Sequence, residues 1–171
     1  MNFFDVVKVR RSIRAFAGQD VEEEKLQRIL EAANHAPSAG NLQAYEIYVV
    51  RKMTDRRALA RASFGQEFVA GAPVSLVFCA CPRRAAPRYG QRGERLYATQ
   101  DATIACTFAM LAATALGLAT VWIGAFSDDQ VWRAIGSPDG SDPVAVLPIG
   151  YPAENPMPSK RRPITDLVHE I

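Results

Sequence analysis

Cysteine and histidine are scarce in this sequence, which contains three cysteines and two histidines among its 171 residues. The odd number of cysteines and the lack of a CxxC pair argue against a disulfide framework and against a zinc site. Cys79 and Cys81 stand two positions apart in an apolar run, so they would share one face of a strand. We therefore expect the cysteines to be small buried hydrophobic side chains, and we expect no metal site.

Long hydrophobic runs are also missing. The longest candidate, residues 102–119, is interrupted by threonines and by Gly117, which does not fit a membrane span. The first nine residues include Asp5 and Lys8 and have no signal-peptide core. The net charge of +2 is too small to indicate a nucleic-acid or acidic-membrane partner. We expect a cytoplasmic protein that binds neither nucleic acid nor membrane.

The two common nucleotide-binding loops are absent as well. No GxGxxG follows a predicted strand, and no GxxxxGK[ST] occurs in the chain. These absences argue against a Rossmann NAD domain and against a P-loop ATPase. The sequence does have the composition of a globular protein, with 49% apolar and 22% charged residues, and its length fits one domain over residues 1–171.

Helical and strand patterns mix without regular alternation, which favours an α+β fold over a doubly wound parallel sheet. Helices are expected at residues 3–9, 54–62 and 95–116 and after Ser127, and a further amphipathic helix is expected to start at the box-like pair Asp20 and Glu23 and to end at Pro37. The candidate N-caps are Asn2, Asp20 and Ser127. Strands are expected at residues 46–50, 73–81, 119–123 and 144–150. Loops are expected at residues 82–95 and 136–142. The first of these is rich in arginine, proline and glycine, so we expect a mobile lid.

Two basic segments could bind an anion. Arg10, Arg11, Ser12 and Arg14 place three guanidinium groups and a hydroxyl within five residues, and arginine forks match phosphate oxygens. Lys160 and Arg161 begin a second cationic group near the C-terminus. Each segment also has a plain interpretation. Cations favourably meet the negative end of a helix dipole, and tail charges are usually solvated.

Two further segments could approach a ligand closely. Pro37, Ser38, Ala39, Asn41 and Gln43 belong to a loop of small and polar residues that offers directional hydrogen bonds. Trp122, Ile123 and Gly124 form a strand end that runs into a glycine turn. The plain alternatives are a loop that satisfies its own turns and an ordinary strand exit.

Together these segments resemble one family. The order of RRSIRAF, PSAGNLQ, QDATIA, ALGLATVWIGAF, LPIGYPAE and KRRP along the chain is similar to that of the FMN-dependent nitroreductase superfamily. The resemblance covers nearly the whole chain, which looks like a compact member. It implies an α+β sandwich with a mostly antiparallel sheet flanked by helices. It also implies a homodimer with exchanged C-terminal tails and with FMN at the interface.

The resemblance also assigns roles to residues. It places Arg10, Arg11, Ser12 and Arg14 on the phosphate and ribityl chain of FMN, with Arg161 and its neighbour Lys160 closing on the phosphate. It places Pro37, Ser38, Ala39 and Asn41, followed by Gln43, in the loop that the other subunit contributes. It places Trp122, Ile123 and Gly124 along the flavin ring. Some larger members have a glutamate near the position of Gly124, so any role of that side chain is missing here.

The implied activity is ping-pong hydride transfer from NADH or NADPH through the flavin to an electron-poor acceptor, such as a nitroaromatic, a quinone or a flavin. No catalytic acid, base or nucleophile is assigned. The alternatives are another enzyme of the superfamily, a non-catalytic FMN-binding storage or regulatory protein, and an anion-binding α+β protein without flavin. The apolar helix before Gly117 and the aperiodic tail at residues 163–171 both favour an obligate homodimer.

Overall fold

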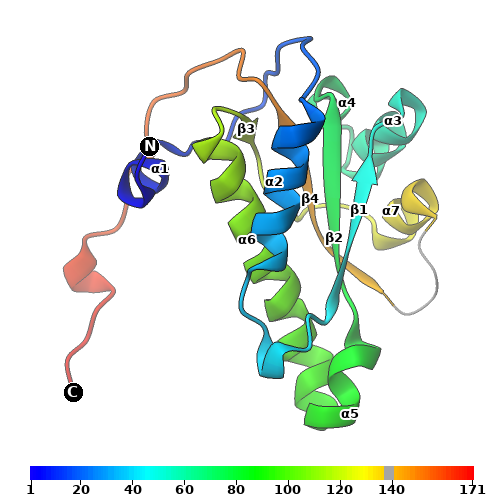
Figure 1. The fold of residues 1–171 in the computed structure, drawn as a ribbon, viewed down its shortest axis with the longest axis vertical. Coiled ribbons are helices and arrows are strands. Elements are labelled where there is room, and N and C mark those ends of the chain that lie inside the picture. The colour runs from blue at the N-terminus through cyan, green and yellow to red at the C-terminus, as the bar shows by residue number, and fades with distance from the viewer. Residues whose placement is uncertain (137–140) are drawn as a thin grey trace.

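The computed structural model describes residues 1–136 and 141–171, and the loop expected at residues 136–142 lies largely outside these residues. Figure 1 shows a sheet between two helical layers. The helices are α1 (Phe3–Val9), α2 (Glu23–Asn34), α3 (Met53–Ala62), α4 (Phe68–Gly71), α5 (Pro82–Arg92), α6 (Ala98–Ala115) and α7 (Asp128–Ile135). The strands are β1 (Tyr45–Val50), β2 (Val74–Ala80), β3 (Ala119–Thr120) and β4 (Asp142–Gly150). Three short helical turns complete the list, namely η1 (Ala39–Asn41), η2 (Gly93–Tyr97, a π-helix) and η3 (Ile164–Asp166).

The four strands form one sheet in the order β1-β2-β4-β3, and every neighbouring pair is antiparallel. The central strand β2 is buried along its whole length. Its side chains alternate between two cores, because successive residues of a strand point to opposite faces. Leu76 and Phe78 join the core beneath α2 and α6, whereas Val77 and Cys79 join the core beneath α3 and α7. The predicted α+β fold with an antiparallel sheet is confirmed.

Helix α6 occupies the centre of one layer, where it packs against α2 and the sheet (Figure 1). Its buried positions include Ala102, Ala105 and Ala109, which are completely inaccessible to solvent. Such small side chains let the helix approach the sheet closely, and this accounts for its uniform apolar composition. The helix was expected to be central or buried against a second subunit, and within this chain it is central.

Several sequence predictions need correction. Residues 82–95 are not a loop, because α5 and η2 cover them and lead directly into α6. Pro82 occupies the first turn of α5, where proline is well tolerated. Strand β3 covers only two residues, and the chain meets the sheet again at a single bridge between Ile123 and Val146. Asp20 is not a cap, because α2 begins after Glu22.

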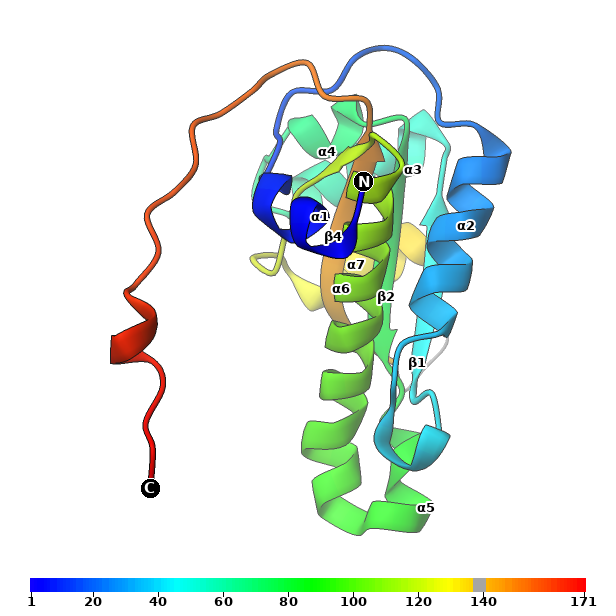
Figure 2. The same ribbon diagram turned by 60° about the vertical axis from the view of Figure 1, so that its left-hand side comes forward.

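The C-terminal tail extends away from the sheet and its helices (Figure 2), and residues 157–171 are exposed throughout. It carries apolar side chains into solvent, with Met157 at 88% exposure and Ile164 at 73%. Helix α1 also exposes Phe3 and Phe4. None of the described helices is both long and apolar enough to cross a membrane.

Candidate functional site

The N-terminal arginine run and the C-terminal cationic run lie on one cavity. This cavity, with a volume of about 840 Å³, lies between the end of α1 and the first part of the tail. Its polar and charged lining residues are Lys8, Arg10, Arg11, Ser12, Arg14, Ser159 and Arg161. The structure therefore brings together the two cationic groups of the sequence, although Lys160 does not line the cavity.

The arginine run is held at this position by the end of α1. The helix starts with a reciprocal capping box between Asn2 and Asp5, as the sequence predicts for Asn2. At the other end, the Arg11 guanidinium donates to the carbonyl oxygens of Lys8 at 2.6 Å and Arg10 at 2.8 Å. Arg11 thus satisfies carbonyl groups at the helix terminus, in agreement with the plain interpretation of this segment.

A carboxylate from the other end of the chain fixes the next residues. Glu154 Oε1 accepts the backbone N–H groups of Arg14 and Ala15, the second at 3.2 Å. One residue earlier, the N–H of Ile13 donates to the carbonyl oxygen of Thr120 at 3.0 Å. Glu154 belongs to the LPIGYPAE motif, but the sequence did not indicate its role. The backbone of the arginine run is therefore anchored to both β3 and the segment after β4.

The cavity is strongly electropositive. Burial lowers the pKa of the Arg10 guanidinium from its ordinary value, and the nearby charges of Arg161 and Arg11 lower it further. Among the residues that the structure describes, no acidic side chain lines the cavity. Since a guanidinium stays protonated at ordinary pH, these charges repel one another without a counter-ion. The arrangement suits a multiply charged anion, and phosphate is the group whose oxygens arginine forks match best.

A second predicted group forms the tight turn η1 between α2 and β1. The Ser38 hydroxyl accepts the N–H of Gln43 at 3.0 Å, and Gln43 Nε2 donates to Asn41 Oδ1 at 2.8 Å. Asn41 and Gln43 both adopt positive φ, at 56° and 46°. The side chains of the loop satisfy one another, as the plain interpretation predicts, yet Gly40 and Asn41 remain exposed, and so does Pro37.

The side chain of Asp101 fixes the position of this loop by accepting two of its backbone N–H groups. It lies in the first turn of α6 and is only 2% exposed. Its Oδ1 accepts the N–H of Ala39 at 2.9 Å, and its Oδ2 accepts the N–H of Ala44 at 3.2 Å. The sequence pattern did not indicate a role for Asp101. The available signal was that Asp101 is the one charged residue of α6.

The third predicted group lies at the sheet edge after β3. The N–H of Ile123 donates to the carbonyl oxygen of Val146 at 3.0 Å, and Ile123 is buried. Trp122 packs against the core in part, and Gly124 is exposed. The backbone at Gly124 is therefore open to the approach of a planar ligand.

The arginine cavity and η1 lie at opposite ends of α6 (Figure 2). Arg10 and Arg11 share a smaller cavity with Thr114, close to the end of α6. Loop η1 instead contacts Asp101 at the beginning of that helix. At about 1.5 Å per residue, Asp101 and Thr114 are separated by about 20 Å along the helix axis. One chain cannot bring both groups to the same part of a small ligand.

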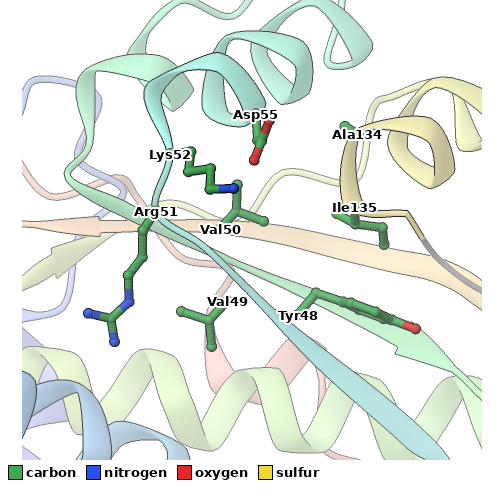
Figure 3. A pocket seen from close by; sticks show the side chains of 8 residues that line it. All are labelled: Tyr48, Val49, Val50, Arg51, Lys52, Asp55, Ala134 and Ile135. Carbon is green, nitrogen blue, oxygen red and sulfur yellow. The ribbon is translucent and has the colours of Figure 1, made fainter.

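A further cavity lies on the other face of the sheet, between β1, α3 and α7 (Figure 3). Its volume is about 350 Å³, and its lining includes Tyr48, Lys52 and Asp55. None of the site residues predicted from the sequence lies there. The candidate functional site is therefore the set of groups around α6.

Comparison with known proteins places this arrangement in a family. The nitroreductase family model matches residues 7–68 and 52–151. The chain is 34% identical to the NADH dehydrogenase of Thermus thermophilus over 186 residues, covering 93% of this chain and 91% of the relative. It is 30% identical to the NADPH-flavin oxidoreductase of Vibrio harveyi, covering 99% of this chain and 73% of the relative.

A solved structure extends this similarity to three dimensions. The structure of NADPH:FMN oxidoreductase from Vibrio harveyi complexed with NAD+ superposes with a TM-score of 0.90 at 30% identity. The match covers 99% of this chain and 77% of that one. The fold is thus that of flavin-handling oxidoreductases, and the chain belongs to the nitroreductase family. The family membership inferred from the ordered motifs is confirmed.

Proposed function

We propose that this protein is an FMN-dependent oxidoreductase that takes electrons from NADH or NADPH and reduces an electron-poor acceptor. The observation that carries the proposal is the cavity lined by Arg10, Arg14 and Arg161, whose described lining contains no acidic side chain. Named relatives support it, since they include an FMN reductase [NAD(P)H] of Bacillus subtilis at 31% identity. They also include an oxygen-insensitive NADPH nitroreductase of Salmonella typhimurium at 31% identity.

The residues present fit FMN in their donors and charge. Arg10, Arg14 and Arg161 would hold the terminal phosphate, and the Ser12 hydroxyl would donate to the phosphate or the ribityl chain. Burial and then the charge of Arg161 lower the pKa of Arg10, and a phosphate dianion would offset that repulsion. Lys160 would contribute only long-range charge, because it does not line the cavity. The exposed backbone at Gly124, beside Trp122 and Ile123, would lie along the flavin ring.

The loop at Pro37–Gln43 would come from a second subunit. Because about 20 Å of helix α6 separates Asp101 from Thr114 in one chain, Ser38, Ala39 and Asn41 need a partner copy to meet the arginine cavity. The exposed apolar side chains of α1 and the tail would supply part of that interface. We propose a homodimer in which each flavin contacts both chains and the tail crosses to the partner.

The chemistry supplied by bound FMN is hydride transfer from NADH or NADPH, followed by reduction of the acceptor in a ping-pong sequence. The acceptor class is a nitroaromatic, a quinone or a flavin. The chain's own residues bind and orient the ligands, and no side chain in the described site is assigned as an acid, base or nucleophile. The backbone at Gly124 and the side-chain amide of Asn41 would form the hydrogen bonds that orient the ligands.

An anaerobic titration tests this function directly. The purified protein, loaded with FMN, is mixed with NADH and with NADPH, and the absorbance of oxidised flavin is followed. Bleaching followed by recovery on addition of a nitroaromatic or a quinone supports an oxidoreductase. A preparation that binds FMN but is bleached by neither nucleotide would instead be a storage or regulatory protein. A preparation that does not bind FMN contradicts both.

A further inference from the structure

The segment between β2 and α6 carries an unusual concentration of positive charge. Residues 82–97 contain five arginines and a single acidic residue, Glu94. The segment is α5 followed by the π-helix η2, so its side chains project from a defined scaffold and not from a loose loop. The two ion pairs found in the described part of the chain, Lys25–Glu22 and Arg51–Glu23, lie elsewhere. Neither of these pairs involves Arg84, Arg88 or Arg92.

Two arginines of α5 rest on the η1 loop. Arg88 Nη1 donates to the carbonyl oxygen of Gly40 at 3.2 Å, and Arg84 Nη2 donates to that of Leu42 at 3.3 Å. Gly40 has a φ of 55°, and a Cβ at this position would lie 2.8 Å from Arg88 Nη1 and would also collide with the Tyr89 hydroxyl. The absence of a side chain at Gly40 thus lets Arg88 and Tyr89 sit directly on the loop.

Aromatic contacts hold these side chains in place. The rings of Tyr89 and Tyr97 meet edge to face, with centroids 5.2 Å apart. Arg92 Nε donates to the Tyr97 hydroxyl at 3.0 Å. The guanidinium of Arg88 lies 5.4 Å from the centroid of the Tyr89 ring. Arg88 and Tyr89 therefore form a wall of guanidinium and phenol groups on the exposed side of η1, which we call the Arg88–Tyr89 wall.

We propose that the Arg88–Tyr89 wall recognises a negatively charged group, a carboxylate or a phosphate, on the ligand that enters beside the flavin. The inference rests on the proposed function, because it is η1 that would border the flavin. A carbonyl oxygen takes only one of the five N–H donors of Arg88 and does not neutralise its charge. The remaining donors and the Tyr89 hydroxyl suit anionic oxygens, and the ring faces suit a planar ligand.

The test compares two planar ligands that differ in charge. Benzoate and benzamide are titrated by calorimetry into the unaltered, FMN-loaded protein and into the Arg88→Met variant. We expect the unaltered protein to bind benzoate more tightly and the Arg88→Met variant to lose about tenfold of this preference, which corresponds to about 1.4 kcal/mol. The Arg95→Met variant is the matched control. It removes the same charge from the same segment. The preference should change by less than about twofold, because water and salt screen the interaction of an exposed charge that does not contact the ligand directly.

The source of the anion is then resolved by kinetics. The ratio of kcat/KM for NADPH over NADH tests the extra phosphate of NADPH, and the ratio for 4-nitrobenzoate over 4-nitrobenzamide tests an anionic acceptor. Arg88→Met should lower at least one ratio, and the one that falls identifies the ligand. Arg88→Lys keeps the positive charge but loses the planar fork of donors. Its ratio should lie between those of the unaltered protein and the Arg88→Met variant. This variant keeps the test valid if Arg88→Met disturbs the loop.

Two outcomes overturn the proposal. One is an unchanged benzoate preference in Arg88→Met, and the other is an equal loss in Arg95→Met, which would show a diffuse charge effect. Failure of the proposed function is distinguishable, because it shows in the unaltered protein as FMN that neither nucleotide bleaches. The calorimetric comparison does not depend on turnover, so it reports on the wall by itself.

Discussion

The carboxylate of Asp101 accepts the backbone N–H of Ala39 at 2.9 Å, so a buried acid at the start of α6 fixes the loop proposed to bind flavin. Its second oxygen accepts the N–H of Ala44 at 3.2 Å. The two bonds bracket η1 and set the position of Ser38 and Asn41 relative to α6. Asp101 is therefore a positioning residue, and its effect on the site should pass through the loop.

Replacing Asp101 with asparagine should loosen η1. The variant keeps the shape of the side chain but substitutes an N–H donor for one acceptor, leaving Ala39 or Ala44 without a partner. Leaving a buried polar group unsatisfied costs about 1–3 kcal/mol, and we expect unfolding free energy to fall by that amount. FMN should also bind about tenfold more weakly, as measured by fluorescence titration.

The control for this variant is Asp20→Asn, which makes the same change at an exposed position outside the helices. It should leave both the unfolding midpoint and the FMN affinity unchanged. A loss of stability in Asp101→Asn with unaltered flavin affinity and an unaltered visible circular dichroism of bound FMN would restrict Asp101 to a structural role.

The phosphate assignment predicts a difference between FMN and riboflavin. Arg161→Ala removes a side chain that lines the arginine cavity. Charge-assisted hydrogen bonds contribute about 1.5–3 kcal/mol, so FMN should bind about one to two decades more weakly, whereas riboflavin should bind almost as before. Equal weakening of the two ligands in equilibrium titrations would show that Arg161 does not contact the phosphate.

Lys160→Ala provides the matched control. It removes the same charge from the neighbouring residue, whose side chain does not line the cavity. We expect less than about a threefold loss of FMN affinity, since water and salt screen the interaction between an exposed charge and the ligand. A Lys160→Ala effect as large as that of Arg161→Ala would indicate a diffuse electrostatic contribution from the whole tail.

A buried thiol should limit stability at alkaline pH. Burial, aided by the charges of Asp142 and Glu46, raises the pKa of Cys79 from 9.0 to about 12. The unfolded chain loses this proton near pH 9 while the folded protein retains it, so unfolding free energy falls as pH rises from about 9 toward 12. The loss amounts to about 1.4 kcal/mol per pH unit for one such group.

The Cys79→Ala variant should therefore show a shallower decline of unfolding free energy between pH 9 and 10.5 in denaturant titrations. The comparison uses slopes, because the smaller side chain also lowers stability at every pH by leaving a cavity. Parallel slopes for the two proteins would contradict the proposed ionisation difference.

Elements with clear periodicity could be predicted from the sequence. The nearly continuous apolar run of β2 follows from burial on both faces of the sheet, and the amphipathic spacing of α2 follows from burial on one face of the helix. Helix α5 was missed because Pro87 and Gly90 normally end helices. Here Pro82 begins the helix, and Gly90 absorbs a kink with a φ of 55°. Strand β3 proved short because the chain leaves the sheet after Thr120 and returns only at Ile123.

The parts of the site that depend on residue type could be predicted from the sequence. The parts that depend on contacts between distant residues could not. A cluster of arginines and a glycine-containing turn can be identified from a single sequence. The contact between Asp101 and Ala39 spans 62 positions, and that between Glu154 and Arg14 spans 140. Periodicity contains no information on such pairs. From the sequence alone, Asp101 is only an acid in a mostly apolar helix, and Glu154 is only a glutamate two residues after a proline.

The proposed sharing of each flavin by two chains predicts an outcome for mixed dimers. Asp101, which contacts η1, and Thr114, which lies beside Arg10 and Arg11, are about 20 Å apart along α6. We therefore expect Arg14 of one chain to act with Asn41 of the partner. A dimer that joins an Arg14→Ala chain to an Asn41→Ala chain would carry both lesions in one site and none in the other. We expect such dimers, purified with two different affinity tags, to retain about half of the FMN content and activity of the unaltered dimer.

Each homodimeric variant, with one lesion in both sites, should bind FMN poorly, and this difference is what identifies sharing. If each chain instead bound its own flavin, the mixed dimer would be damaged in both sites and would behave like the average of the two variants. Removal of the residues after Pro163 provides an independent measurement, because the tail exposes apolar side chains such as Ile164 and Val168. The truncated protein should dissociate at higher concentration in sedimentation experiments and lose FMN in parallel, whereas a fully flavin-loaded monomer at high dilution would exclude the shared site.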